Sequence, residues 1–457
     1  MNSPQVFDVR QQGAIGDGCS KDTLAIQKAI DRAGESGGVV YFPAGNYLSG
    51  TLHLRSGVTI ELSEDAVLIA NREDSDFDAC EKLDYESFAD HETTSFRYAL
   101  LCGEEVQNIC IRGRGFIDGR GTERGGPKPI ALKRCRQISI TDVTLKNAPN
   151  YNLSLLGCAH AEIRNVTIVN GFVDGIDVDC CRHVNIANCR IESRNDAICL
   201  KTSLALGARH STQHITINDC ILTTTRNAFK LGSESAGDFK NIALTNCTIL
   251  HRPEIFQERP AAGISLLAVD GGNIEGVVIS DISLTGVRVP IFIRLGNRGL
   301  GQIGPPLPGQ LHNVSISRVV AKQADLAALI AGIPGHCVAR LSLNNISTSL
   351  LCGGKSEAAQ LEPAEKIDTY PHASMFGVLP ACGVYIRHAV DLTLDDVKLR
   401  LENLDTRPAL FMDDVENISV RHFDVAPKTG AESMVRLERG RAEPFFPPLA
   451  VTIESAR

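Results

Sequence analysis

The chain has 457 residues and a formal net charge of −8 at pH 7, and hydrophobic residues make up 43% of it. This length exceeds one ordinary compact domain, and the hydrophobic share is sufficient for a large core. The acidic balance and the lack of a lysine- and arginine-rich run exclude nucleic acid as an expected partner. Because no run of 18 apolar residues occurs, we also expect no membrane-spanning helix.

The start of the chain and the pattern of its cysteines indicate in which cellular compartment the protein is expected. Residues 1–6 (MNSPQV) lack the basic and apolar segments of a secretory signal peptide. The fifteen cysteines are odd in number and lack the tight spacing of a disulfide framework. Cys189, Cys220 and Cys247 recur at equivalent places, which favours a stack of buried thiols over a metal site. We expect a cytoplasmic protein, or a periplasmic or secreted one if a leader has been removed.

The first predicted element is an N-terminal cap within residues 1–60. Residues 22–30 (DTLAIQKAI) begin with an N-capping aspartate and have apolar residues at helical spacing. The predicted inward-facing side chains are Leu24, Ile26, Ala29 and Ile30. The strands predicted below form a stack, and the open end of such a stack invites pairing with strands of other molecules. We therefore expect this helix to cover the N-terminal end of the stack.

Two short sequence motifs, called the first and the second phrase below, recur along the chain. The first occurs at residues 173–178 (VDGIDV), 195–200 (NDAICL) and 227–232 (NAFKLG). The second begins at positions 165, 188, 219, 246 and 281, each time with Asn or Asp before alternating apolar residues. Alternation is typical of strands, and three short strands per irregular coil of roughly 22 to 35 residues indicate a parallel β-helix. We therefore predict an all-β, parallel β-helix that forms a single domain over residues 1–457.

Two segments depart from the repeat. Residues 355–380 contain Pro363, Pro371 and Pro380 and predict a long loop insertion near the functional groove, over which 370–376 would fold. Residues 444–448 (PFFPP) end the regular pattern. His183 and His214 stand at equivalent starts of buried strands, and we interpret both as structural.

If the first phrase stacks in register, its polar residues form two columns on one face. The columns are Asp174, Asp196 and Asn227, and beside them Asp177, Cys199 and Lys230. Side chains on adjacent parallel strands start about 4.8 Å apart, and their divergence can reach the spacing of glycosidase carboxylates. We predict Asp174 and Asp196 as the main catalytic pair and Asp177 as the alternative acid. An aspartate before glycine is also a common turn residue, which is the alternative for Asp174.

Other polar residues near these columns are predicted to bind substrate. Lys201 and Lys230 would favour ionisation of a neighbouring acid, and arginines beyond the acids could grip a substrate carboxylate. For each residue the alternative is an ordinary turn or surface role. The predicted substrate-binding residues are Tyr151, Asn195, Lys201, Asn227, Lys230, Glu234, Asp270, Arg294 and Arg298.

Several motifs, taken in order, resemble a known family. Residues 8–18, 39–47 and 109–119 resemble the opening segment of pectin-degrading β-helices. Residues 174–177 (DGID) and 195–201 (NDAICLK) are similar to two active-site motifs of glycoside hydrolase family 28, which holds polygalacturonases and rhamnogalacturonan hydrolases. The resemblance implies a right-handed parallel β-helix and inverting hydrolysis by aspartates on one sheet. It assigns Asp174 to the first motif and Asp196 to the second position of the family's Asp-Asp pair.

The chain departs from the family at three motifs. Asn195 stands where the family's acid usually lies, residues 226–228 (RNA) replace Gly-His-Gly, and residues 265–267 (SLL) replace Arg-Ile-Lys. The missing basic residues bind galacturonate in polygalacturonases. The resemblance therefore implies a diverged member, and the looser rhamnogalacturonan-active branch is favoured.

Three functions follow from these patterns. The leading hypothesis is an inverting hydrolase of uronic-acid-containing oligosaccharides, pectic in type and exo-acting, without a metal or other cofactor. The first alternative is a lyase, with calcium at Asp174, Asp177 and Asp179 and with Lys230 or Arg294 as base. The second is a non-catalytic glycan-binding β-helix. The oligomeric state is left open.

Overall fold

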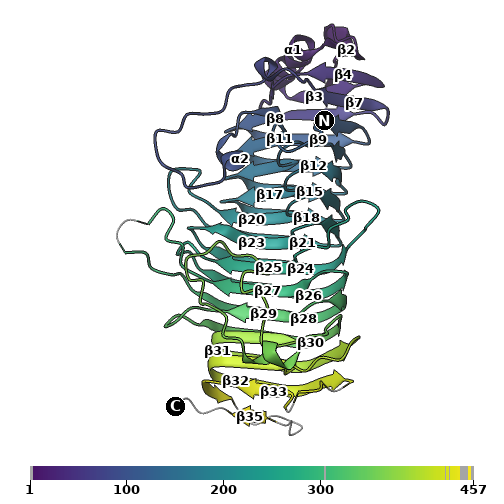
Figure 1. The fold of residues 1–457 in the computed structure, drawn as a ribbon. Coiled ribbons are helices and arrows are strands. Elements are labelled where there is room, and N and C mark those ends of the chain that lie inside the picture. Colours follow the sequence, from purple (N-terminus) through teal and green to yellow (C-terminus); the bar gives the residue numbers. More distant parts are fainter. Residues whose placement is uncertain (1–3, 303–304, 428, 432, 443–450, 454–457) are drawn as a thin grey trace. The chain divides into compact units, whose positions relative to one another are not determined.

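The computed structural model describes residues 4–302, 305–427, 429–431, 433–442 and 451–453. They belong to two compact units, an N-terminal unit of residues 1–221 and a C-terminal unit of residues 222–457. Each unit is a stack of parallel strands, so the predicted parallel β-helix is confirmed in both (Figure 1). The single-domain expectation stays a prediction, and the predicted end of the pattern at 444–448 lies outside the described residues.

The N-terminal unit contains three series of parallel strands. The first series is β1 (Gln5–Asp8), β3 (Gly38–Phe42), β6 (Val58–Leu62), β9 (Gln107–Gly113), β12 (Arg136–Thr141), β15 (Ala159–Arg164), β18 (Arg182–Ala187) and β21 (Thr212–Asn218). The second series is β2 (Asp17–Lys21), β4 (Gly45–Ser49), β7 (Ala66–Ala70), β10 (Phe116–Asp118), β13 (Thr144–Lys146), β16 (Thr167–Gly171) and β19 (Arg190–Ser193). The third series, called the site sheet below, is β5 (Leu52–His53), β8 (Ala99–Glu104), β11 (Lys128–Lys133), β14 (Leu153–Leu156), β17 (Ile176–Asp179) and β20 (Ile198–Thr202).

The C-terminal unit is built from longer strands. One series is β23 (Asn227–Ser235), β25 (Ala262–Ala268), β27 (Val289–Leu295) and β29 (Ala328–Ala331). The other is β24 (Phe239–Leu250), β26 (Ile274–Thr285), β28 (Leu311–Ala324) and β30 (Val338–Leu350). Both series continue into β31 (Val384–Leu401) and β32 (Leu410–Ala426). The remaining strands are β22 (Ile221–Thr224), β33 (Val435–Leu437), β34 (Gly440–Ala442) and β35 (Val451–Ile453).

The alternation of buried and exposed residues along the strands explains the hydrophobic core of each coil. On β15 every second residue is buried, and Ile163 pairs in register with Ile140 of β12 and Ile186 of β18. Burying such aliphatic columns stabilises the stack by roughly 25 cal/mol per Å² of apolar surface removed from water. β17 and β20 depart from alternation because all their residues are buried. On these strands the outward polar side chains are therefore covered as well.

The predicted N-terminal helix is confirmed as α1 (Thr23–Ser36), with two corrections. Ile26, Ala29 and Ile30 are buried, but Leu24 is 86% exposed, because the inward stripe continues to Ala33 instead. The Asp22 carboxylate does not cap the helix; it accepts hydrogen bonds from the backbone N–H groups of Ile15 and Gly16 at 2.7 and 3.0 Å. Asp22 therefore ties the preceding turn to the helix start.

The other helices are short and lie in connections. They are α2 (His91–Thr94) and the 3-10 helices Arg10–Gln12, Asp74–Asp76 and Ser356–Gln360. Between β30 and β31 the described chain forms no strand, and the repeat is interrupted over the residues predicted as a loop insertion, 355–380. A second long connection, residues 71–98, joins β7 to β8 and carries α2. Among the described helices none is long and apolar enough to cross a membrane.

Three histidines on successive rungs of the first series form a stack of rings. The rings of His160, His183 and His214 stack on adjacent rungs, with centroids 4.8 and 4.9 Å apart. All three are exposed, and the structural interpretation of His183 and His214 stays a prediction. All three have a positive φ, between 56° and 59°, near the start of their strands. All fifteen cysteines lie within the described residues and none forms a disulfide there, and Cys189, Cys220 and Cys247 are buried as predicted.

Candidate active site

The two central aspartates of the N-terminal unit lie on neighbouring rungs. β17 pairs with β20 in parallel, with Asp177 opposite Cys199, and Gly175 N donates to Asp196 O at 2.9 Å. This register places Asp174 beside Asp196, as the spacing of the repeated phrase predicted. Both aspartates are 2% exposed. The other members of the predicted columns, Asn227 and Lys230, belong to the C-terminal unit and are described with it below.

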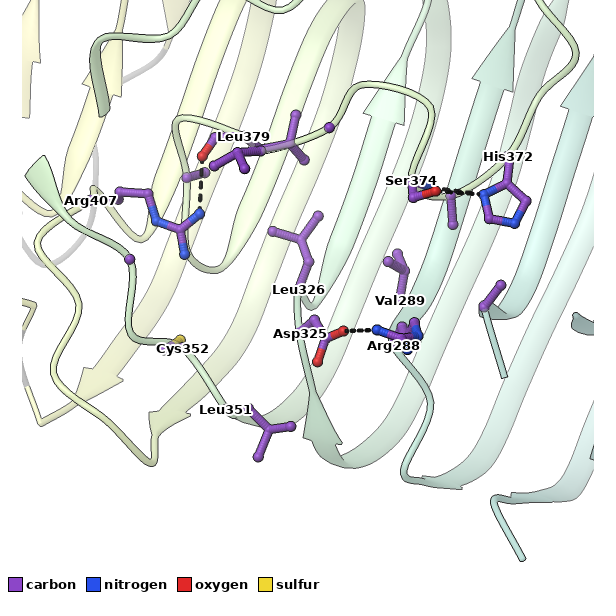
Figure 2. A pocket seen from close by; sticks show the side chains of 16 residues that line it. Arg288, Val289, Asp325, Leu326, Leu351, Cys352, His372, Ser374, Leu379 and Arg407 are labelled. Carbon is purple, nitrogen blue, oxygen red and sulfur yellow. Dashed lines mark hydrogen bonds and ion pairs between the residues drawn. The ribbon is translucent and has the colours of Figure 1, made fainter. Parts of the chain in front are cut away.

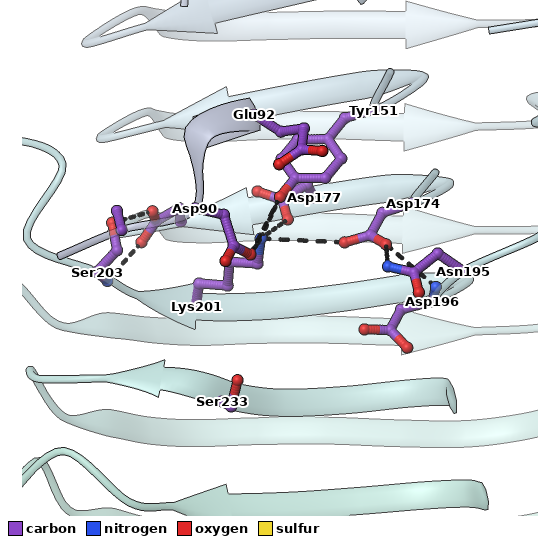
Figure 3. A network of polar contacts seen from close by, with 12 residues as sticks. Asp90, Glu92, Tyr151, Asp174, Asp177, Asn195, Asp196, Lys201, Ser203 and Ser233 are labelled. Atoms are coloured by element: carbon purple, nitrogen blue, oxygen red, sulfur yellow. Dashed lines mark hydrogen bonds and ion pairs between the residues drawn. The ribbon is translucent and has the colours of Figure 1, made fainter. Parts of the chain in front are cut away.

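Asp174 is held by two N–H donors on the next rung. Asn195 Nδ2 donates to its Oδ1 at 2.6 Å, and the backbone N–H of Asp196 donates to the same oxygen at 3.1 Å (Figure 3). Hydrogen bonds donated to a carboxylate favour its ionised form. The amide that replaces the expected acid at Asn195 is thus a neutral donor that stabilises a negative charge on Asp174.

Asp177 lies in a different environment. Its side chain is 1% exposed, Oδ2 lies 2.9 Å from Lys201 Nζ, and Oδ1 has no hydrogen-bond partner among the described residues. Burial raises the pKa of Asp177 well above its ordinary value, and the ammonium of Lys201 opposes part of that effect. The negative charges of Asp174 and Asp179 raise the pKa further. Asp177 therefore holds a proton more readily than an ordinary aspartate.

Lys201 connects the buried acids of the site sheet. It is 2% exposed, and its Nζ donates to Tyr151 Oη at 2.7 Å and lies 4.4 Å from the centre of that ring. The same Nζ lies 3.5 Å from Asp90 Oδ2 and 4.0 Å from Asp174 Oδ2. A buried ammonium surrounded in this way compensates carboxylates that would otherwise be costly to bury. Tyr151, predicted to touch substrate, is itself 2% exposed and supports Lys201.

Three residues at this site were not predicted from the sequence. Asp90 and Glu92 lie on the connection 71–98, where Glu92 pairs with Arg124 and Asp90 reaches Lys201. Lys128 on β11 is fully buried, donates to Ser95 O at 2.8 Å, and has its pKa lowered to about 8 by burial. For Asp90 and Glu92 the sequence did contain a signal. The stretch 71–98 is acid-rich and does not repeat, so it has the features of an insertion, as 355–380 does.

The arrangement does not fit the predicted calcium site. Asp179 Oδ1 accepts from Ser203 N at 2.9 Å and from Cys180 Sγ at 3.2 Å, and its Oδ2 accepts from the Ser203 hydroxyl. Asp174, Asp177 and Cys199 do offer atoms within 4.8 Å of one another, but one of these is a thiol and an ammonium lies beside Asp177. Calcium requires six to eight oxygen ligands, which these residues do not supply.

The C-terminal unit contains a basic cluster around an exposed tyrosine. Lys230 Nζ lies 3.5 Å from Tyr370 Oη and 6.0 Å from its ring centre, and the Arg298 guanidinium lies 5.6 Å from the same ring. Asp270 accepts from Arg298 Nε and Nη2 at 2.9 and 2.6 Å. Tyr370 is 54% exposed. The long loop therefore brings an accessible ring between two cations, as expected for a segment that folds over this sheet.

Arg294 has a different role from the predicted one. It is 1% exposed, and it donates to the backbone oxygens of Gly332, Glu365 and Lys366 at 2.6, 2.8 and 2.9 Å. Its guanidinium also lies 5.2 Å from the Phe376 ring, and burial lowers its pKa to about 10. The expectation that Arg294 binds a substrate carboxylate is corrected, because its donors are used to hold the long loop.

The remaining predicted residues lie on β23 and in the adjacent rung. Asn227 Oδ1 accepts a hydrogen bond from Ser265 Oγ at 2.8 Å, and Lys230 pairs in register with Ser265. Glu234 is on the same strand and is 7% exposed. Ser265 thus fills the space beside Lys230 where the family motif has a basic residue.

Comparisons with known proteins identify the family to which the chain is similar. The model of the family described as rhamnogalacturonase A/epimerase, pectate lyase-like matches residues 6–252, more than half of the chain. A probable polygalacturonase of Vitis vinifera is 24% identical over 372 residues, which are 75% of this chain and 74% of that protein. An exo-poly-alpha-D-galacturonosidase of Dickeya chrysanthemi is 21% identical over 70% of this chain, which spans 63% of that protein. A probable rhamnogalacturonase A of Aspergillus oryzae is 26% identical over 44% of this chain, which spans 40% of that protein.

Solved structures share the fold. A family 28 exopolygalacturonase of Yersinia enterocolitica superposes with a TM-score of 0.69 at 17% identity, covering 92% of this chain and 78% of that one. An exopolygalacturonase of Thermotoga maritima superposes with a TM-score of 0.64 at 18% identity, covering 76% of this chain and 89% of that one. The predicted right-handed parallel β-helix is thereby confirmed. Together with the motifs at Asp174 and Asp196, these matches show that the chain belongs to the rhamnogalacturonase A/epimerase, pectate lyase-like family, as a diverged member of glycoside hydrolase family 28.

Proposed function

We propose that the protein is an inverting glycoside hydrolase that acts on uronic-acid-containing oligosaccharides of the pectic type. The observation that carries the proposal is a pair of buried carboxyl groups on adjacent rungs, one of which, Asp174, is held by two N–H donors. Asp174 accepts from two N–H donors and is held as a carboxylate, which suits a general base. Asp196, one rung away, is then assigned as the general acid in place of the carboxyl that Asn195 lacks.

In this mechanism Asp174 removes a proton from a water molecule as its oxygen attacks the anomeric carbon. Asp196 donates its proton to the glycosidic oxygen while the bond between that oxygen and the anomeric carbon breaks. Attack from the opposite face inverts the configuration. Asp177 is the alternative acid, supported by its raised pKa. Asp177 Oδ2 is paired with Lys201 Nζ, which in turn donates to Tyr151 Oη.

The basic cluster of the C-terminal unit supports the choice of an acidic sugar. Lys230 and Arg298 flank the exposed Tyr370 ring, a combination that suits a uronate carboxylate and the face of a sugar ring. We assign exo-action from the two long segments 71–98 and 351–383, each of which covers polar residues of its own unit. The names of the relatives, which include an exo-poly-alpha-D-galacturonosidase and two exopolygalacturonases, support this assignment.

The test is an activity screen on galacturonan and rhamnogalacturonan oligosaccharides. Asp174→Asn and Asp196→Asn are each expected to lower kcat by about 10²- to 10⁴-fold, the usual contribution of a general base or acid. Asp142→Asn is the matched control, because Asp142 occupies a left-handed turn elsewhere in the unit that Asn also tolerates. Full activity of Asp196→Asn would refute its assignment as acid.

Two measurements separate the alternatives. Nuclear magnetic resonance of the first product formed should show the inverted anomer, and a retained anomer would exclude the inverting mechanism. A lyase would instead give an unsaturated product that absorbs ultraviolet light. Chromatography of early products from a long substrate should show one short species, whereas a ladder of lengths would indicate endo-action.

A further inference from the structure

Two cysteines bracket the long loop of the C-terminal unit. Cys352 follows the end of β30, and Cys382 lies just before the start of β31. Their Sγ atoms and one oxygen of Asp405 all lie within 4.8 Å of one another. Both thiols are free. A loop of 29 residues, 353–381, thus has one cysteine beside each end, and the two thiols lie close together.

Backbone hydrogen bonds hold both ends of the loop in place. The Asp405 carboxylate accepts from Gly353 N and Gly354 N at 3.0 and 2.7 Å. On the other side, Cys382 N donates to Pro408 O at 3.0 Å, and Arg407 Nη1 donates to Leu379 O at 3.0 Å (Figure 2). The backbone beside both cysteines is therefore held in place by contacts with one segment, residues 405–408.

The chemistry of this cluster favours a dithiol over a metal site. Asp405 accepts five hydrogen bonds, two from the glycine N–H groups above and three from Arg407 N, Nε and Nη2 at 2.9, 3.0 and 2.8 Å. A carboxylate has about four acceptor positions, so none is left to bind a cation. The Arg407 guanidinium beside it also repels a metal ion. The two sulfur atoms are the reactive groups that remain.

A cavity gives access to one of the two thiols. It has a volume of about 370 Å³, and Cys352 lies in its wall with Leu351, Leu326, Leu379 and Arg407 (Figure 2). Cys352 is half-buried, whereas Cys382 is fully buried. A small oxidant that enters the cavity therefore reaches Cys352 first.

We propose that Cys352 and Cys382 are a redox modification site, which a peroxide oxidises to a disulfide that clasps the base of the loop. In the first step Cys352 Sγ attacks one peroxide oxygen, the O–O bond breaks, and a sulfenic acid and one water form. In the second step Cys382 Sγ attacks Cys352 Sγ, the S–O bond breaks, and the S–S bond and a second water form. Two thiols lose two electrons in total, and one hydrogen peroxide is reduced to two waters.

The clasp acts on a loop that carries contacts of the basic cluster. The loop supplies Tyr370 beside Lys230 and the two carbonyl groups, of Glu365 and Lys366, that Arg294 holds. A disulfide at the base reduces the conformations that the opened loop can adopt, and so opposes its opening. Oxidation is therefore expected to hold the loop in place beside Lys230 and Arg294. Reduction of the disulfide by a thiol is expected to release the loop.

The full-length protein tests the proposal directly. After treatment with hydrogen peroxide, unfolding, alkylation and trypsin, the peptides 341–355 and 367–387 should be found joined, because Lys355, Lys366 and Arg387 separate them and each has one cysteine. A thiol reductant should separate them. Recovery of both peptides in alkylated form, or of Cys352 over-oxidised beside an alkylated Cys382, would overturn the site. Cys189 and Cys220 form the control pair, since both are buried and should stay reduced.

A second measurement tests the clasp itself. Native protein is exposed to trypsin, and cleavage after Lys366 in the loop is followed with and without peroxide. We expect oxidation to slow this cleavage by about tenfold, because cleavage requires the loop to open locally. The Cys382→Ser protein should show no such change, and this control separates the disulfide from general oxidation. Equal cleavage rates in oxidised and reduced wild-type protein would overturn the clasp.

Discussion

Asn195 Nδ2 donates a 2.6 Å hydrogen bond to Asp174 Oδ1, and it does so from the position where the related motif carries a carboxyl group. Two carboxylates in that arrangement would repel each other, whereas an amide and a carboxylate attract. The substitution thus replaces a contact between two acids by a contact between Asp174 and a neutral donor. It is the feature that most distinguishes this chain from the motif it resembles.

The first prediction concerns Asn195→Asp. The new carboxylate would lose the N–H donor and face Asp174 at hydrogen-bond distance, so we expect the free energy of unfolding to fall by about 2 kcal/mol at pH 7. The loss should shrink near pH 4, where one of the two acids takes up a proton. Urea unfolding at both pH values measures this difference. A variant as stable as wild type at pH 7 would mean that the contact contributes nothing.

The second prediction concerns the buried pair of Lys201 and Asp177, 2.9 Å apart. Lys201→Met should destabilise the protein by about 3 kcal/mol at pH 7, since it leaves buried acids without their cation. The pKa of Asp177 is already raised by burial, so the folded protein binds a proton that the unfolded chain has released. Stability of the variant should therefore fall as pH rises above about 4, the ordinary range of an aspartate. Addition of Asp177→Asn to Lys201→Met should restore most of the lost free energy of unfolding. If it does not, the two residues contribute to stability independently of each other.

The third prediction uses the pKa of Lys128, which burial lowers to about 8. An unfolded lysine keeps its proton to about pH 10.4, so between these values the unfolded chain binds more protons than the folded one. Stability that depends on Lys128 is thus present at high pH and lost as pH falls through 8. Relative to Lys128→Met, the wild-type protein should gain about 2 kcal/mol between pH 8 and 10. Denaturant unfolding of both proteins across this range checks the gain, and parallel curves would show that Lys128 titrates normally.

The fourth prediction concerns Lys230 and rests on the proposed substrate. Lys230→Met removes a cation beside Tyr370, so KM for a uronate oligosaccharide should rise by about tenfold while kcat changes little. The matched control is Lys240→Met, which removes a half-exposed lysine on β24 that pairs with Asp238 at 3.0 Å. Steady-state kinetics of both variants provide the measurement. Equal KM values in wild type and Lys230→Met would exclude a binding role for this lysine.

The sequence by itself determined the coil and the register of the acids. The alternating strands required one buried and one outward face, and the matching internal pattern of the phrases at Asp174 and Asp196 required that the two stack. In a parallel, in-register sheet equivalent positions of successive coils lie at a fixed distance in space. For this reason the local pattern alone is enough to place Asp177 opposite Cys199.

The tertiary structure decided what covers the outward face. The connection 71–98 brings Asp90 to Lys201, and the loop after β30 takes up Arg294 and presents Tyr370 to Lys230. Neither loop has a periodic pattern, because its path is set by contacts with side chains far away in the sequence. Alternation says only that a side chain points outward; whether it then meets water, as His183 does, or a covering loop, as Arg294 does, depends on those long-range contacts.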